Sequence, residues 1–231
     1  MKRFYKEVSV APVEGGFEVH LDGRPIRTPN RQVMTIPTKE LADIVAAEWD
    51  RQKEFVEIGV MPLTRLAYAA IDHVGRNRAD VVEQISKYAE TDLVSYRAEG
   101  PRPLQEMQDN AWQPLVEWME KRFGVRLAVT EGIIPIEQDP EHMAMIREVV
   151  EGIDDFRLAA VQAVTTASGS VAIGLALWDD AIEPDKAWEV AQVEENYQIG
   201  FWGDDLNAMA MREGRKQTLM AGAEILRVLN K

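Results

Sequence analysis

The sequence has 231 residues, of which 46% are hydrophobic and 28% are charged, and a chain of this size can bury a full core. It carries 26 Lys and Arg against 39 Asp and Glu, a formal net charge of −13 with histidine neutral. Nucleic acids and anionic membranes are poor partners for so acidic a chain, because phosphate binding needs clustered basic side chains. The sequence has no cysteine, which excludes disulfides, thiolate nucleophiles and cysteine-bound zinc.

Residues 1–37 predict strands and turns. Phe17, Val19 and Leu21 alternate with polar residues, which is the period expected of a strand with one buried face. Residues 33–36 predict a further strand. The first 37 residues have six basic and four acidic side chains, whereas the other 194 have 20 basic and 35 acidic ones. This division predicts a small β module attached to an acidic helical body.

Helical periodicity begins after Thr38, a residue type favoured at helix N-caps, and it places Leu41, Val45 and Trp49 on one face. The pattern predicts further helices at residues 63–74, 77–95, 104–123, 140–151, 156–178, 184–202 and 204–229. We therefore expect an α+β fold. A small β-rich N-terminal domain with one helix would span residues 1–60, and a larger all-helical C-terminal domain would span residues 61–231.

The longest uncharged stretch of the sequence runs from residue 158 to residue 178. Its length is that of a membrane-spanning helix, which needs about 20 predominantly apolar residues. Polar residues interrupt it, however, and Ser168, Gly169 and Ser170 follow one another near its middle. We therefore expect a buried core helix that is broken or tightly packed near Gly169, and no membrane insertion.

The sequence lacks the common catalytic motifs. It has no glycine-rich phosphate loop, no dinucleotide-binding turn and no zinc-binding H-E-x-x-H helix. His20, His73 and His142 lie far apart, and none belongs to a metal-binding or triad motif. Several acidic residues occur as adjacent pairs, but neighbours on a helix point about 100° apart and do not face each other. We expect no catalytic residue, no metal site and no cofactor.

Glu195 occupies an unusual position for an acidic residue. Projection of residues 184–202 as one helix places Trp188, Ile199 and Trp202 on one stripe, and Glu195 lies within that stripe. A carboxylate among such neighbours must be paired, protonated or waiting for a partner, because an unpaired buried charge is costly. Two interpretations stay open at this point: an internal ion pair with an arginine elsewhere in the fold, or recognition of a partner.

Trp49 also has two interpretations. It shares the apolar face of its helix with Leu41 and Val45, so core packing is the default and contact with a partner is the alternative. Methionines near the C-terminus either fill the core or form an adaptable recognition surface. These are Met209, Met211 and Met220.

Five blocks of the sequence follow one another in the order found in a known family. They are Gly15–Pro29, Glu48–Gln52, Met61–Leu66, Glu90–Arg97 and Glu194–Gly203. These blocks resemble the ATP12 family, assembly chaperones of the catalytic head of the F-type ATP synthase.

The resemblance implies a small β-rich domain, a larger helical domain and no enzymatic activity. It also implies binding to the unassembled alpha subunit, which the chaperone shields until alpha pairs with beta. The family's functionally sensitive glutamate falls on Glu195 or Glu194, and the tryptophan of its Glu-Trp-Asp block falls on Trp49.

The residues and the resemblance together predict a partner-binding site. Its predicted residues are Glu195, Glu194, Trp49, Trp188, Ile199 and Trp202. We expect an exposed apolar area with an acidic rim to cover a matching surface on the alpha subunit, while the acidic helical body attracts a basic region of that partner. We further expect a monomer. Because the sequence lacks the long targeting extension of mitochondrial members, we expect the bacterial cytoplasm, or a trimmed form in the mitochondrial matrix.

Two other functions stay open. An acid–base hydrolase would use Glu195 with a distant carboxylate such as Asp92 or Asp205. It predicts a concave pocket that holds two carboxyl groups within roughly 5 to 10 Å of each other. A stable subunit of a larger complex would remain in the finished assembly, whereas a chaperone leaves it.

Overall fold

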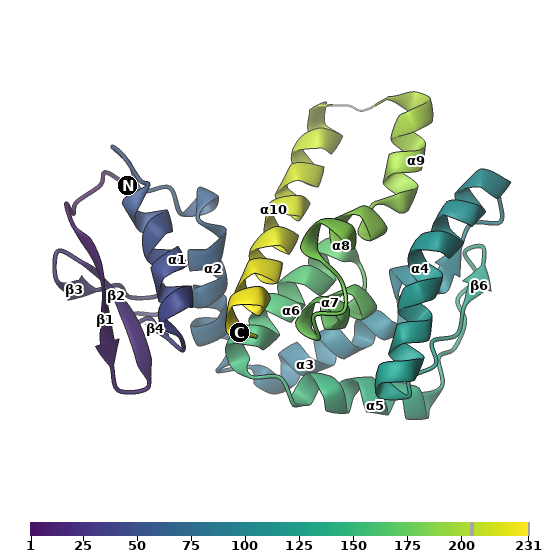
Figure 1. Ribbon diagram of the computed structural model, residues 1–231, viewed down its shortest axis with the longest axis horizontal. Helices are drawn as coiled ribbons and strands as arrows, with labels where there is room; N and C mark the ends of the chain where they lie inside the picture. Colours follow the sequence, from purple (N-terminus) through teal and green to yellow (C-terminus); the bar gives the residue numbers. More distant parts are fainter. Residues whose placement is uncertain (204–205, 231) are drawn as a thin grey trace.

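The computed structural model describes residues 1–203 and 206–230. A four-stranded sheet lies at the N-terminal end, and the rest of the molecule is mainly helical, with one short two-stranded sheet (Figure 1). The predicted α+β class is confirmed. The division into domains at residue 60 stays a prediction.

The N-terminal sheet has four antiparallel strands, and β2 pairs with each of the other three. They are β1 (Val8–Val13), β2 (Gly16–Leu21), β3 (Arg24–Pro25) and β4 (Thr35–Ile36). The predicted alternation in β2 is confirmed, since Val19 and Leu21 are buried while His20 lies on the other face and contacts Glu18. Gly16 lets β4 approach closely, because a Cβ there would lie 2.3 Å from the backbone oxygen of Ile36.

Helix α1 (Lys39–Asp50) packs against β1 and β2 and closes the small core of this end. The predicted N-cap is confirmed: the side chain of Thr38 accepts a hydrogen bond from the backbone N–H of Leu41. Leu41, Val45 and Trp49 are buried on the inner face, as the periodicity predicts. The other helices are α2 (Pro62–Ala69), α3 (Arg78–Lys87), α4 (Arg102–Phe123), α5 (Pro140–Glu151), α6 (Asp155–Ser168), α7 (Val171–Trp178), α8 (Pro184–Ala191), α9 (Val193–Trp202) and α10 (Leu206–Leu229).

Helices α6 and α7 form the centre of the helical part. The predicted break is confirmed, because Gly169 ends α6 with a φ of +75° and the Ser170 side chain caps α7. Helix α10 packs along α6, where a Cβ on Gly222 would lie 2.9 Å from the backbone oxygen of Ala160. No helix in the described ranges combines the length and the apolar character needed to cross a membrane.

Two predicted helices differ from the structure. The segment 184–202 forms α8 and α9, because the backbone of Gln192 leaves the helical conformation at φ −111° and ψ 14°. The segment 77–95 ends as α3 at Lys87 and continues in short 3-10 turns (Tyr88–Thr91 and Leu93–Ser95). Strand β5 (Tyr96–Arg97) then pairs in parallel with β6 (Thr130–Glu131).

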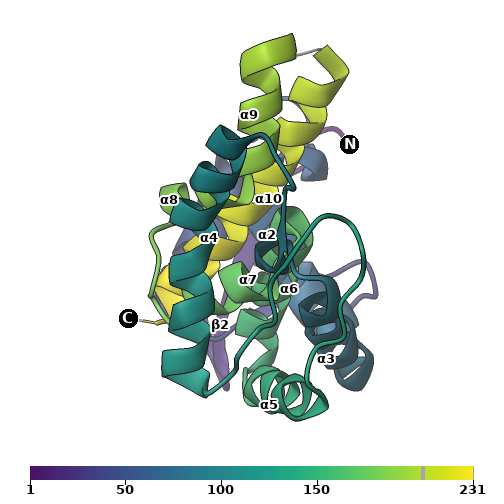
Figure 2. The same ribbon diagram turned by 90° about the vertical axis from the view of Figure 1, so that its right-hand side faces the viewer.

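Helices α9 and α10 form a hairpin that projects from the helical body (Figures 1 and 2). The view in Figure 2 places α4 beside this hairpin, and α4 contacts α9. Of the predicted helix 204–229, residues 206–229 form α10. Asp204 and Asp205 lie outside the described residues.

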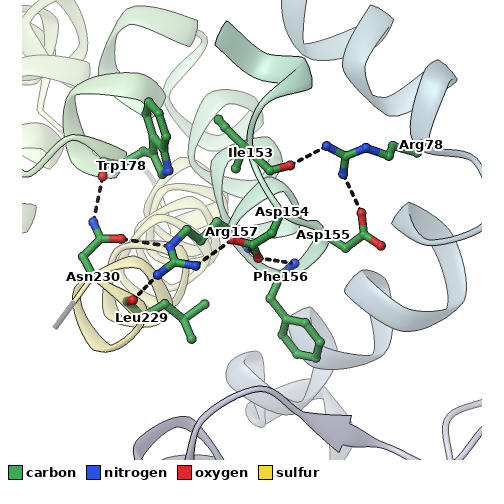
Figure 3. Close-up of polar contacts among 9 residues, drawn as sticks. All are labelled: Arg78, Ile153, Asp154, Asp155, Phe156, Arg157, Trp178, Leu229 and Asn230. Carbon is green, nitrogen blue, oxygen red and sulfur yellow. Dashed lines mark hydrogen bonds and ion pairs between the residues drawn. The ribbon is translucent and has the colours of Figure 1, made fainter. Parts of the chain in front are cut away.

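The opposite end of α10 is fixed by the polar network in Figure 3. Arg157, near the start of α6, donates hydrogen bonds to the carbonyl of Leu229 and to the side chains of Asn230 and Asp154. Asn230 in turn donates to the carbonyl of Trp178 over 2.7 Å. These contacts tie the C-terminal end of α10 to α6 and α7, so the other end carries the hairpin on an anchored helix.

Candidate partner-binding site

The end of the α9–α10 hairpin exposes a group of large apolar side chains. Phe201 and Trp202 close α9 and are 69% and 82% exposed, and Leu206 opens α10 and is 84% exposed. Met209 and Met211 follow on α10 and are at least half exposed. We call these five residues the apolar tip. Large apolar side chains that are exposed close together in the chain are candidates for contact with another molecule.

The end of α9 depends on Gly203. Its φ of +75° lies in the region that favours glycine, and its N–H still bonds the carbonyl of Ile199 over 2.9 Å. Helix α9 therefore stops directly after Trp202. The two aromatic side chains that end the helix stand at the end of the hairpin instead of packing against the body.

A cleft of about 670 Å³ lies beside the apolar tip. It is bounded by α9, α10 and the end of α6, and its lining includes four of the six predicted partner-binding residues. These four are Glu194, Glu195, Ile199 and Trp202. The structure thus brings together the predicted residues of the Glu194–Gly203 block.

Glu195 lies in the lining of this cleft and forms an ion pair with Arg215 of α10. Arg212, one turn before Arg215 on α10, donates a hydrogen bond to the side chain of Asn196, the neighbour of Glu195. The internal ion pair that the sequence offered as one interpretation of Glu195 is therefore present. Both charged side chains remain partly accessible, so the pair stabilises the fold little and leaves Glu195 within reach of a partner.

Glu194 points toward the other side of α9. It accepts a hydrogen bond of 2.6 Å from the side chain of Gln108, a buried residue of α4, whose Oε1 accepts from the N–H of Ala98. Glu194 also lines a second cavity of about 650 Å³ between α9 and the loop that follows β6. It therefore belongs to two neighbouring hollows, one on each side of α9.

Trp188 and Trp49 lie apart from this cleft. Trp188 is 7% exposed on α8, and it does not share a stripe with Ile199 and Trp202 because α8 and α9 are separate helices. The single-stripe prediction was wrong for this reason. Trp49 is 4% exposed on α1, which packs against the N-terminal sheet. Its burial fits the default interpretation, packing in the core.

The sequence reasoning missed two parts of the site. Neither Phe201 nor Leu206 is among the residues predicted from the sequence. Both flank Gly203, and a glycine between two apolar helix ends was the available signal for an exposed hairpin end. The partner of Glu195 had no such signal, because 20 residues separate it from Arg215 and only the packing of α9 against α10 joins them.

Asp92, one of the two carboxylates suggested for a hydrolase, does not line the cleft that holds Glu195. Asp92 is fully buried, and its two oxygens accept from the N–H groups of Val94 and Ala172 at 3.1 and 3.2 Å. Burial raises the pKa of Asp92 to about 6. Asp92 thus joins the start of α7 to the turn before β5. Asp205 lies outside the described residues.

An exposed apolar tip beside a charged cleft is typical of a protein that binds another protein. Comparison with known proteins agrees with this class. The family model of the ATP12 chaperone protein matches residues 2–120. The chain is 26% identical over 238 residues to the mitochondrial protein atp12 of Schizosaccharomyces pombe, covering 97% of this chain and 81% of that protein.

Solved structures are similar over almost the whole chain. The crystal structure of Atp12 from Paracoccus denitrificans superposes with a TM-score of 0.92 at 34% identity, over 98% of this chain and 97% of that one. A structure from Agrobacterium tumefaciens superposes with a TM-score of 0.93 at 35% identity, over 99% of this chain and 86% of that one. The chain belongs to the ATP12 family of chaperone proteins.

Proposed function

We propose that this protein is an assembly chaperone of the F-type ATP synthase that binds the unassembled alpha subunit and shields it until alpha pairs with beta. The observation that carries the proposal is the apolar tip. Burying one large apolar side chain is worth about 1.5 to 3 kcal/mol. The five exposed side chains of the apolar tip therefore leave a large free energy of burial unused in water, and a partner surface that covers them would gain it.

The charges around the apolar tip suit a basic partner region. Glu194 and Glu195 line the adjacent cleft, and residues 38–231 hold 20 basic and 35 acidic side chains. Charge complementarity of this kind speeds the encounter and selects the partner, while apolar contact supplies the affinity. A basic region of the alpha subunit would approach the cleft while its apolar surface covers the apolar tip.

A chaperone must also release its client. The apolar tip is confined to one hairpin end, so a beta subunit that offers a larger apolar interface can displace it. The proposal places the protein where the alpha subunit is made or imported, the bacterial cytoplasm or the mitochondrial matrix. It involves no catalytic step.

The test is suppression of aggregation of the unassembled alpha subunit. The wild-type chain should keep alpha in solution, and the double variant Phe201→Ser/Trp202→Ser should lose most of this effect, since it removes two side chains that are 69% and 82% exposed. Phe55→Ser is the matched control, because Phe55 is also an exposed phenylalanine, at 53%, but lies outside the hairpin. Equal protection by the double variant and the control would refute the role of the apolar tip.

A further inference from the structure

Arg97 is a buried arginine with unused hydrogen-bond donors. Its side chain is 5% exposed, and neither terminal nitrogen of the guanidinium has a hydrogen-bond partner. The Nε atom lies 3.4 Å from a carboxylate oxygen of Asp109, which is itself mostly exposed, and the guanidinium lies 5.1 Å from the ring centroid of Trp112. Arginine stays charged in proteins, so leaving these donors unpaired in the core costs free energy.

Arg97 lines the cavity of about 650 Å³ that Glu194 also lines. Strand β5 carries Arg97 at one wall, and the loop after β6 forms another wall with Gly132 and Ile133. Ile133 and its neighbour Ile134 are 94% and 76% exposed. The hollow therefore combines a buried cation at its wall with exposed apolar side chains at its rim.

The acidic side chains around Arg97 are engaged or point elsewhere. Glu194 accepts its hydrogen bond from Gln108, and the carboxylate of Glu99 packs against Gly132, where a Cβ would lie 2.7 Å from it. Glu131 lines a smaller hollow of about 320 Å³, which Arg97 and Asp109 also line. None of these carboxylates bonds the terminal nitrogens of Arg97.

The chemistry of the hollow selects a carboxylate. The two terminal nitrogens of a guanidinium match the two oxygens of a carboxylate in a bidentate pair. A phosphate would bring about two negative charges against Glu99 and Glu194, whereas a carboxylate brings one. The exposed Ile133 and Ile134 favour a carboxylate carried by a polypeptide with apolar residues beside it over a free ion.

We propose that Arg97 is a carboxylate-binding residue, and that an aspartate or glutamate side chain of the partner protein enters this hollow and pairs with its guanidinium. This inference rests on the proposed function, because Glu194 lines both this hollow and the cleft beside the apolar tip, so the two hollows are neighbours. The acidic cleft attracts the basic region of the partner. The Arg97 hollow fixes where one acidic residue of that partner must lie.

The experiment compares three variants for affinity to the unassembled alpha subunit and for melting temperature. Arg97→Met removes the charge and keeps an apolar chain against Trp112. Arg97→Lys keeps the charge but lacks the two terminal nitrogens that form a bidentate pair with a carboxylate. Arg102→Met is the control, because Arg102 lines the smaller hollow and is 86% exposed, so its loss removes the same charge from a nearby exposed position.

Arg97→Met should weaken alpha binding at least tenfold, Arg97→Lys should lie between it and the wild type, and Arg102→Met should stay within twofold. The melting temperature of Arg97→Met should equal or exceed that of the wild type, because the variant removes a buried charge whose two terminal nitrogens have no hydrogen-bond partner. Binding by Arg97→Met within twofold of the wild type would overturn the proposal. A clearly lowered melting temperature would also overturn it, by assigning Arg97 a structural role.

Failure of the wild type to bind alpha would refute the proposed function. Carboxylate binding in the hollow would then be tested without a partner protein. Succinate is then the probe. A rise in the melting temperature of the wild type that Arg97→Met lacks would support a carboxylate site, and no rise would overturn it. A succinate effect together with undiminished alpha binding by Arg97→Met would assign the hollow to a small carboxylate and overturn the partner side chain.

Discussion

Reversing the charge of Glu195 separates the two interpretations of this residue. The side chains of Glu195 and Arg215 are 27% and 44% exposed, so their ion pair contributes about 0.2 to 1 kcal/mol to stability. Glu195→Lys removes this pair and sets two like charges side by side, for a total cost of about 1 to 2 kcal/mol. In a protein of this size each kcal/mol lowers the melting temperature by about 2 to 4 °C. The variant should therefore remain folded.

The effect on binding should be larger than the effect on stability. Close charge pairs across protein interfaces couple by about 1.5 kcal/mol or more, which is at least tenfold in affinity. Glu195→Lys should therefore bind the unassembled alpha subunit at least tenfold more weakly in an equilibrium titration. A folded variant with unchanged affinity would remove Glu195 from the site.

The charge-swapped double variant Glu195→Arg/Arg215→Glu provides the decisive control. It restores an ion pair across the hairpin but places a positive charge where the partner meets a negative one. If Glu195 acts only by holding α9 against α10, the double variant binds alpha like the wild type. If Glu195 contacts the partner, binding stays weak although the melting temperature recovers. Recovered binding would refute direct contact between Glu195 and the partner.

Three further variants test contacts that hold the fold. Burial raises the pKa of Asp92 to about 6 from 3.8, so the native state binds this proton more readily than the unfolded chain does, and the contribution of Asp92 to stability falls as pH rises through 6. Between pH 5 and pH 7 the free energy of unfolding should fall by about 1 kcal/mol for this reason, and Asp92→Asn should not show this fall. The same dependence of stability on pH in the wild type and in Asp92→Asn would contradict this. Glu48 accepts hydrogen bonds from the N–H groups of Leu63 and Thr64 at the start of α2, so Glu48→Ala should destabilise by about 1 to 3 kcal/mol in urea, and an unchanged midpoint would contradict it. Gly222→Ala should lower the free energy of unfolding by about 1 to 3 kcal/mol, because the added methyl group would force α10 away from α6. A variant that is more stable than the wild type would show that the two helices accommodate the methyl group.

Local patterns in the sequence predict much of this fold. The alternation in β2, the Thr38 cap and the break at Gly169 each follow from residues close in sequence, and the structure has all three. The junction between α8 and α9 was missed because Gln192 is neither glycine nor proline and gives no local sign of a break. Packing of α8 and α9 against different neighbours, α10 and α4, accompanies that break.

The candidate site could be predicted only in part, for the same reason. Glu195, Ile199 and Trp202 lie within one turn or two of each other on α9, so helical spacing brings them together. The ion pair between Glu195 and Arg215 and the unpaired hydrogen-bond donors of Arg97 depend on contacts between distant segments. Helical projection carries no information about such contacts, because it describes one segment at a time.

Hydrogen exchange of this protein, free and bound to the unassembled alpha subunit, tests most directly whether the hairpin is the binding surface. Slower exchange should concentrate in α9 and in the first half of α10, and it should vanish when beta displaces the chaperone. Protection confined to the N-terminal sheet and α1, with none in the hairpin, would contradict binding through the apolar tip.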